Sequence, residues 1–149
     1  MKTIYLAGGC FWGTEHYMRQ FEGVVETVVG YANGSLAEPS YQEVYTDQTG
    51  HVECVKVVYD EAVVSLKTLC RMFFRSIDPL LLNRQGGDLG TRYRTGIYWV
   101  CEEDNDVVEQ VWQEVQARFS EPLAVEKRPL KCFYSAEEYH QDYLLKNPE

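Results

Sequence analysis

The chain has 149 residues, of which 45% are hydrophobic and 13% aromatic, and this is the size and composition of one globular domain with its own core. Its 14 Lys and Arg against 23 Asp and Glu give a formal net charge of −9, so most of the surface should repel a nucleic-acid backbone or an anionic lipid surface. We therefore expect a single domain over residues 1–149 that binds neither nucleic acid nor membrane.

The beginning of the chain does not read as a targeting segment. The apolar run from Ile4 to Ala7 is shorter than the hydrophobic region of a secretory leader. No later stretch approaches the roughly 18 uninterrupted apolar residues of a membrane-spanning helix.

Five cysteines form an odd set without a CxxC pair, which fits neither a disulfide framework nor a structural zinc site. They are Cys10, Cys54, Cys70, Cys101 and Cys132. Unpaired thiols persist in a reducing compartment. The sequence therefore predicts a cytoplasmic protein without a metal or other cofactor, and we expect a monomer.

The first third of the chain alternates between strand and helix patterns. Residues 2–7 predict a short strand, and Gly8-Gly9 then turns the chain into a helical pattern over 11–21. Residues 24–31 are rich in β-branched side chains and predict a second strand. The stretch 32–50 is polar or rich in Gly, Ser and Pro, which favours a loop and irregular structure.

Residues 51–59, HVECVKVVY, give the clearest strand pattern in the sequence. The alternation of a strand places Glu53, Val55 and Val57 on one face. Cys54 then points to the opposite face.

The same patterns continue to the end of the chain. In chain order they predict a helix over 65–76 with Ser65 as its N-cap, a loop over 80–93, a strand over 94–101, a helix over 105–119, a weak strand over 123–125 and a short helix over 136–145. Without the tail, the order is strand, helix, strand, strand, helix, strand. This order predicts an α+β fold, a two-layer ferredoxin-like (split βαβ) sandwich with a C-terminal extension.

Cys10 is predicted at a helix N-terminus, where unpaired N–H groups and the helix dipole favour a thiolate. We therefore expect its pKa below the free value of about 8.5. Gly8 and Gly9 would let a ligand approach, while Phe11 and Trp12 would supply apolar surface for a group such as a methyl. The alternative is a buried core cysteine beside ordinary packing aromatics.

Four blocks of the sequence resemble successive motifs of one enzyme family. They are GCFWG at 9–13, Tyr41 with TGHVE at 49–53, RQGGDLGTRYR at 84–94 and FYSAEEYHQDY at 133–143. The family is that of the peptide methionine sulfoxide reductases of type A, and the resemblance covers almost the whole chain. It also implies a two-layer α+β sandwich.

The resemblance assigns chemical roles to five residues. Cys10 would attack the sulfoxide sulfur, and Glu53 would protonate the departing oxygen. Tyr41 and Tyr93 would donate hydrogen bonds to that oxygen, and Asp88 would organise the site. Composition alone would instead favour a solvated glutamate, packing or surface tyrosines and a turn-forming aspartate.

The resemblance further implies a thiol cycle that acts on free and peptide-bound methionine S-sulfoxide. Phe11 and Trp12 would hold the substrate methyl group, and methionine would leave a sulfenic acid on Cys10. Thioredoxin, or glutaredoxin with glutathione, would serve as the thiol reductant. Some members of the family carry selenocysteine at the nucleophile position.

Many family members carry a resolving cysteine in a C-terminal tail, whereas here no cysteine follows the last shared block. Cys132, just before that block, is the internal candidate. Direct reduction of the sulfenic acid by an external thiol is the equally weighted alternative.

Two other functions fit parts of the pattern. A cysteine hydrolase could use His51 or His140 as the base for Cys10, because Cys10-Phe11-Trp12 faintly resembles the surroundings of a papain-type nucleophile. A non-enzymatic binding module could instead present Trp12 and the tyrosines as an aromatic patch. Such a module would tolerate Cys10→Ser, whereas a reductase would not.

Overall fold

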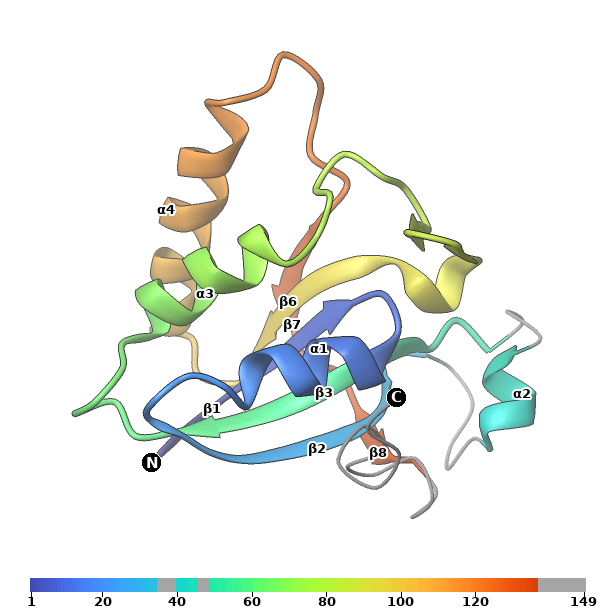
Figure 1. The fold of residues 1–149 in the computed structure, drawn as a ribbon, viewed down its shortest axis with the longest axis horizontal. Helices are drawn as coiled ribbons and strands as arrows, with labels where there is room; N and C mark the ends of the chain where they lie inside the picture. The colour runs from blue at the N-terminus through green and yellow to red at the C-terminus, as the bar shows by residue number, and fades with distance from the viewer. Residues whose placement is uncertain (35–39, 46–48, 137–149) are drawn as a thin grey trace.

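The structure, a computed structural model, describes residues 1–34, 40–45 and 49–136. Its main element is a six-stranded sheet with the order β7-β6-β1-β3-β2-β8. The strands are β1 (Lys2–Gly8), β2 (Val24–Ala32), β3 (Val52–Tyr59), β6 (Thr95–Trp99), β7 (Glu126–Pro129) and β8 (Phe133–Ser135). Figure 1 shows this curved sheet with helices packed on it.

The helices are α1 (Phe11–Met18), α2 (Tyr41–Tyr45), α3 (Leu66–Arg75) and α4 (Asp104–Gln116). A 3-10 helix, η1 (Thr91–Tyr93), precedes β6, and a separate hairpin is made of β4 (Arg84–Gln85) and β5 (Asp88–Leu89). No helix in the described ranges is both long and apolar enough to span a membrane.

The four inner strands confirm the predicted α+β class. Strand β3 pairs antiparallel with both β1 and β2, so β1 and β2 run parallel with β3 between them and α1 as their connection. That is the split βαβ connection. Strand β6 pairs antiparallel with the other side of β1. The C-terminal extension adds β7 parallel to β6 and β8 antiparallel to β2.

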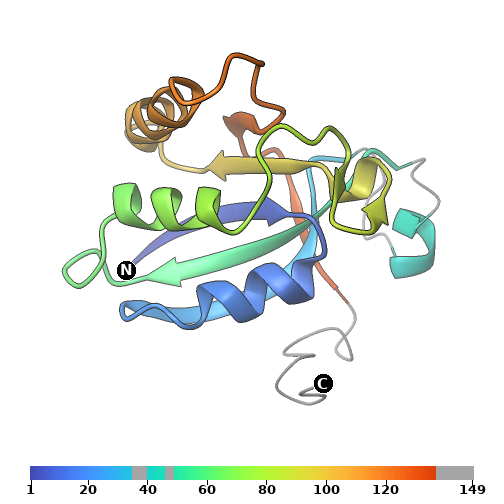
Figure 2. The ribbon, with the colours of Figure 1, turned by 45° about the horizontal axis from the view of Figure 1, so that its top comes forward.

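The two faces of the sheet are covered differently. Apolar side chains such as Ile4, Val55 and Phe73 join one face to α1, α3 and α4 in a single core, and Figure 2 shows these helices over the sheet. On the far face, Cys54 and its neighbours form a second, smaller cluster with Leu130 and Phe133 packed against it. The chain therefore crosses the far face between β7 and β8, from one edge of the sheet to the other.

Two predicted local features are confirmed. In β3, Val55 and Val57 belong to the helix-side core, and Cys54 belongs to the far-side cluster. Ser65 caps α3 by accepting a hydrogen bond from the Thr68 amide at 3.1 Å, which satisfies one of the free N–H groups of the first turn.

Other predicted boundaries were wrong. Residues 41–45 form α2 instead of irregular structure, and 80–93 contains the β4–β5 hairpin and η1 instead of a plain loop. The weak strand expected at 123–125 lies at Glu126–Pro129, because its pairing with β6 sets the register. Strand β8 was not predicted. Of the helix predicted over 136–145, residues 137–145 lie outside the described residues.

The edge pairing of β8 gives a stability prediction at Gly30. A Cβ at Gly30 would lie 2.4 Å from the Tyr134 carbonyl oxygen and 2.5 Å from the Phe133 ring. Gly30→Ala should therefore lower the free energy of unfolding by about 1–3 kcal/mol, as overpacking usually does. Urea denaturation measures this change.

Gly13→Ala is the matched control, because a Cβ at Gly13 in α1 meets no atom within 4 Å. It should raise stability by about 0.5–1 kcal/mol through helix propensity. Equal effects of the two substitutions would contradict the described packing of β8 on β2.

Candidate active site

Cys10 lies where β1 turns into α1. Strand β1 ends at Gly8, Gly9 takes a φ of +88°, and Cys10 occupies the N-cap position of α1 with extended backbone angles. The backbone amides of Trp12 and Gly13 lie near its sulfur and favour the ionised form of the thiol. The predicted placement of this thiol at a helix N-terminus is therefore confirmed.

The β4–β5 hairpin packs against this turn. A Cβ at Gly9 would lie 2.7 Å from the Gln85 side chain, so only glycine allows both the backbone angle and this close approach. The Gln85 side chain accepts from the Asp78 amide at 2.9 Å and donates to the Asp78 carbonyl at 2.8 Å. Gln85 therefore fixes the hairpin beside Cys10. Sequence reasoning gave it no role, although it stands within the block at 84–94.

Glu53 is buried on the helix side of β3, with 1% of its surface exposed. Its Oε1 accepts a hydrogen bond of 3.1 Å from the Phe11 amide, so the carboxyl satisfies a free N–H at the start of α1. The solvated glutamate considered above is excluded. Glu53 and Cys10 are electrostatic neighbours, since the charge of Glu53 acts on the thiol.

The protonation of Cys10 differs from the sequence-based prediction. Burial raises the pKa of the Cys10 thiol to about 11, and the negative charges of Glu53 and, more weakly, Asp88 add to this rise. The amides of Trp12 and Gly13 lower the pKa but do not outweigh burial. The prediction of a depressed pKa was wrong, because a helix N-terminus favours a thiolate only where desolvation and nearby carboxylates do not oppose it.

Tyr93 in η1 and Asp88 in β5 both lie in the surroundings of Cys10 and Glu53. Burial raises the pKa of Tyr93; a hydrogen bond to Arg92 opposes this rise, while the charges of Glu53 and Asp88 add to it. The Arg92 guanidinium also lies over the Tyr93 ring, 4.4 Å from its centroid. The structure thus brings Cys10, Glu53, Tyr93 and Asp88 into one electrostatic neighbourhood.

An open hollow of about 410 Å³ adjoins the thiol. Its lining includes Cys10, Gly13, Tyr17, Gln85 and Asp88. The hollow is large enough to admit a side chain or a small ligand. Cys10 is therefore half-buried and lines an open hollow.

The two aromatic residues after Cys10 have different environments. Phe11 is 1% exposed and belongs to the main core, with its ring centroid 5.8 Å from that of Tyr31. Trp12 is half-buried, 6.0 Å from Phe11 between centroids. Phe11 therefore supports the site from the core, whereas Trp12 lies closer to the surface.

The remaining predicted residues are not among the groups that act on the Cys10 thiol, or they lie outside the described part of the chain. Tyr41 begins α2, but its side chain falls outside the described part of the chain, as does His140. The Cys132 thiol lies 3.6 Å from the Gly34 carbonyl, in the segment that crosses the far face of the sheet. His51 is buried, and its Nδ1 accepts from the Gly34 amide at 3.1 Å.

A thiol-dependent enzyme can use a nucleophile, an acid and a hydrogen-bond donor. An accessible thiol, a buried carboxyl and a buried phenol can supply these three functions. Within the described ranges, no three His, Cys, Asp or Glu side chains gather as a metal site would require. Comparison with known proteins identifies the family.

The family model of peptide methionine sulfoxide reductase matches residues 2–149. The chain is 53% identical over 148 residues to the peptide methionine sulfoxide reductase MsrA of Clostridium botulinum, with 99% of this chain and 94% of that protein covered. It is 50% identical to MsrA of Mycoplasma pneumoniae, with the same coverage. The chain therefore belongs to the peptide methionine sulfoxide reductase family, a family of oxidoreductases.

Solved structures agree with this assignment. The crystal structure of Mxr1 from Saccharomyces cerevisiae in reduced form superposes with a TM-score of 0.94 at 40% identity, covering 99% of this chain and 86% of that one. Mxr1 in complex with Trx2 superposes with a TM-score of 0.67 at 30% identity, covering 95% and 84%. The fold predicted from the sequence is thus shared with methionine sulfoxide reductases.

The raised pKa of Cys10 predicts how its alkylation depends on pH. Iodoacetamide should modify Cys10 of the reduced protein at a rate that still increases above pH 9, because the thiolate is the nucleophile and the pKa is raised to about 11. Glu53→Gln should move the profile to lower pH, since it removes a negative charge that raises this pKa. Peptide mass spectrometry quantifies the modification.

Cys101 is exposed and serves as an internal measure of reagent activity in each sample. A Cys10 profile that levels off near pH 8.5, or coincident profiles of wild type and Glu53→Gln, would contradict the described environment of the thiol.

Proposed function

We propose that this protein reduces the S epimer of methionine sulfoxide, free or within a polypeptide, with Cys10 as the nucleophile and Glu53 as the proton donor. The observation that carries the proposal is the placement of the Cys10 thiol beside the buried Glu53 carboxyl, at the opening of a hollow. A cysteine hydrolase would need a histidine as its base, whereas the titratable groups whose charges act on the Cys10 thiol are the carboxylates of Glu53 and Asp88.

The reaction balances without an external proton. The Cys10 thiol transfers its proton to Glu53, and the thiolate attacks the sulfoxide sulfur. The attack forms a bond between the two sulfur atoms, and Glu53 protonates the sulfoxide oxygen. The resulting hydroxyl group moves from the methionine sulfur to the Cys10 sulfur as the sulfur–sulfur bond breaks, which releases methionine and leaves Cys10 as a sulfenic acid. The cysteine sulfur loses two electrons, and the sulfoxide sulfur gains them. The raised pKa of Cys10 supports this sequence, because it keeps the proton in the site until the substrate is bound.

The other residues orient the substrate. The Tyr93 phenol, and that of Tyr41, donate hydrogen bonds to the sulfoxide oxygen, where negative charge develops in the transition state. Trp12, supported by Phe11, holds the methyl group. Asp88 keeps the site polar on the side of the hairpin.

Substitution of Glu53 tests the acid directly. Glu53→Gln should slow methionine formation in a single turnover by roughly 10² to 10⁴-fold, because the amide keeps the shape but cannot protonate the oxygen. Binding of the sulfoxide should change little. Rapid-quench assays with reduced protein and the S epimer measure both quantities.

Glu15→Gln is the matched control, since Glu15 is also buried on the helix side and accepts from the Thr27 hydroxyl at 3.0 Å, away from the thiol. It should react at the wild-type rate, and Cys10→Ser should form no methionine. Wild-type rates in Glu53→Gln would remove Glu53 from the mechanism, and methionine formation by Cys10→Ser would overturn the proposed function.

An external thiol regenerates Cys10 in our proposal. The groups that act on the Cys10 thiol are two carboxylates and two backbone amides, whereas the Cys132 thiol lies against the Gly34 carbonyl on the far-face crossing. The solved complex of the related Mxr1 with Trx2 supports thioredoxin as the reductant. Glutaredoxin with glutathione is the alternative of the same class, and all five cysteines are free, which fits a reducing cytosol.

This regeneration route predicts the behaviour of Cys132→Ser. Its steady-state rate with thioredoxin or dithiothreitol should equal that of wild type, because Cys132 takes no part in the cycle. Methionine formation coupled to reductant oxidation measures the rate. A large loss of turnover, together with a Cys10–Cys132 disulfide in the wild-type protein, would contradict external regeneration.

A further inference from the structure

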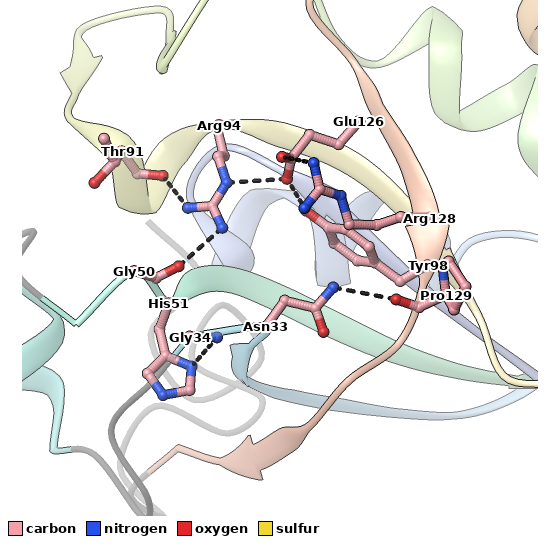
Figure 3. A network of polar contacts seen from close by, with 10 residues as sticks. All are labelled: Asn33, Gly34, Gly50, His51, Thr91, Arg94, Tyr98, Glu126, Arg128 and Pro129. Atoms are coloured by element: carbon pink, nitrogen blue, oxygen red, sulfur yellow. Dashed lines mark hydrogen bonds and ion pairs between the residues drawn. The ribbon is translucent and has the colours of Figure 1, made fainter.

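Arg94 connects three segments of the chain near the site. It follows η1 directly and precedes β6. Its Nη1 donates to the Thr91 carbonyl at 2.9 Å, its Nη2 to the Gly50 carbonyl at 2.8 Å, and its Nε to Glu126 Oε1 at 2.9 Å. Figure 3 shows the guanidinium between these three acceptors.

Two of the three acceptors belong to segments that carry proposed catalytic groups. Thr91 is the first residue of η1, which ends at Tyr93. Gly50 precedes β3, which carries Glu53. Although η1 and Gly50 are distant in sequence, the Arg94 side chain joins the backbone of η1 to a residue two positions before β3.

The third acceptor anchors the guanidinium to the sheet. Glu126 is the first residue of β7 and is in register with Gly96 of β6. Its carboxylate also accepts from the Tyr98 hydroxyl at 2.7 Å and pairs with Arg128 at 3.0 Å. A carboxylate held by these contacts fixes the direction of the Arg94 fork.

We propose that Arg94 is a positioning residue for sulfoxide reduction: it holds η1 against the start of β3 and so sets Tyr93 relative to Glu53 and Cys10. This inference rests on the proposed function. Arg94 acts through the backbone of Thr91 and Gly50. Its loss should therefore lower the rate of the chemical step more than substrate binding, since small misplacements of catalytic groups are costly.

Arg94→Lys is the test variant, because an ammonium keeps the charge facing Glu126 but lacks the planar fork that reaches three acceptors. It should lower the single-turnover rate at saturating sulfoxide roughly 10- to 100-fold. The sulfoxide concentration that gives half of this maximal rate should change little. Arg128→Met is the matched control, since it removes the other Glu126 ion pair while leaving both carbonyl contacts of Arg94. It should react at the wild-type rate.

A double-mutant cycle with Tyr93→Phe distinguishes positioning from a general structural role. If Arg94 acts through η1, Arg94→Lys should slow a Tyr93→Phe protein much less than it slows wild type. Should Arg94→Lys fail to fold, Glu126→Gln in the same cycle weakens the anchor and should show a smaller loss with the same dependence on Tyr93.

Any of three results would overturn this role of Arg94. Arg94→Lys could react as fast as Arg128→Met, or Tyr93→Phe alone could react at the wild-type rate. In the double variant, Arg94→Lys could also slow the reaction by the same factor as it does in the wild-type background. These results would leave Cys10 and Glu53 in their roles. Failure of the proposed function has a different signature, namely methionine formation by Cys10→Ser.

Discussion

The hydrogen bond from the Phe11 amide to the buried Glu53 carboxyl joins the start of α1 to β3 across 42 residues of sequence. It places the N-terminus of the helix over the strand, and thereby places Cys10, one residue earlier, beside a carboxyl that has 1% of its surface exposed. A buried carboxyl needs hydrogen-bond partners, and the free amides of a helix end supply one. The same contact thus joins helix α1 to strand β3 and brings the proposed acid and the proposed nucleophile together.

The electrostatics of the pair explain why a helix N-terminus does not produce a thiolate in the substrate-free protein. Burial of Cys10 dominates, and Glu53 and Asp88 oppose a further negative charge. A thiol that keeps its proton is less exposed to adventitious oxidation or alkylation, since thiolates are the reactive form. Transfer of that proton to Glu53 when a sulfoxide binds would supply the nucleophile and the acid in one step.

The sequence predicted features that depend on local patterns. The alternation over 51–59 placed Glu53 on the same face as Val55 and Val57, and Gly8-Gly9 placed Cys10 at a helix start. Two-residue strands such as β4 and β5, and an edge strand such as β8, carry too few residues for a pattern, because pairing partners decide them. The family resemblance, not periodicity, selected Tyr93 and Asp88.

The pKa of Cys10 and the role of Arg94 could not be predicted from the sequence for the same reason. Both depend on groups that the fold brings from distant segments: Glu53 and Asp88 around the thiol, and Gly50, Thr91 and Glu126 around the guanidinium. Local sequence shows the helix end beside Cys10 and the arginine after Tyr93. It does not show which charges and carbonyls surround them.

In our proposal, the electrons for sulfoxide reduction leave the protein through Cys10. Dimedone trapping during one turnover, with peptide mass spectrometry of all five cysteines, tests this route. We expect one dimedone adduct on Cys10 for each methionine formed from the S epimer, and none on the other four thiols. Methionine formation with the adduct on another cysteine, or with no oxidised cysteine at all, would contradict it.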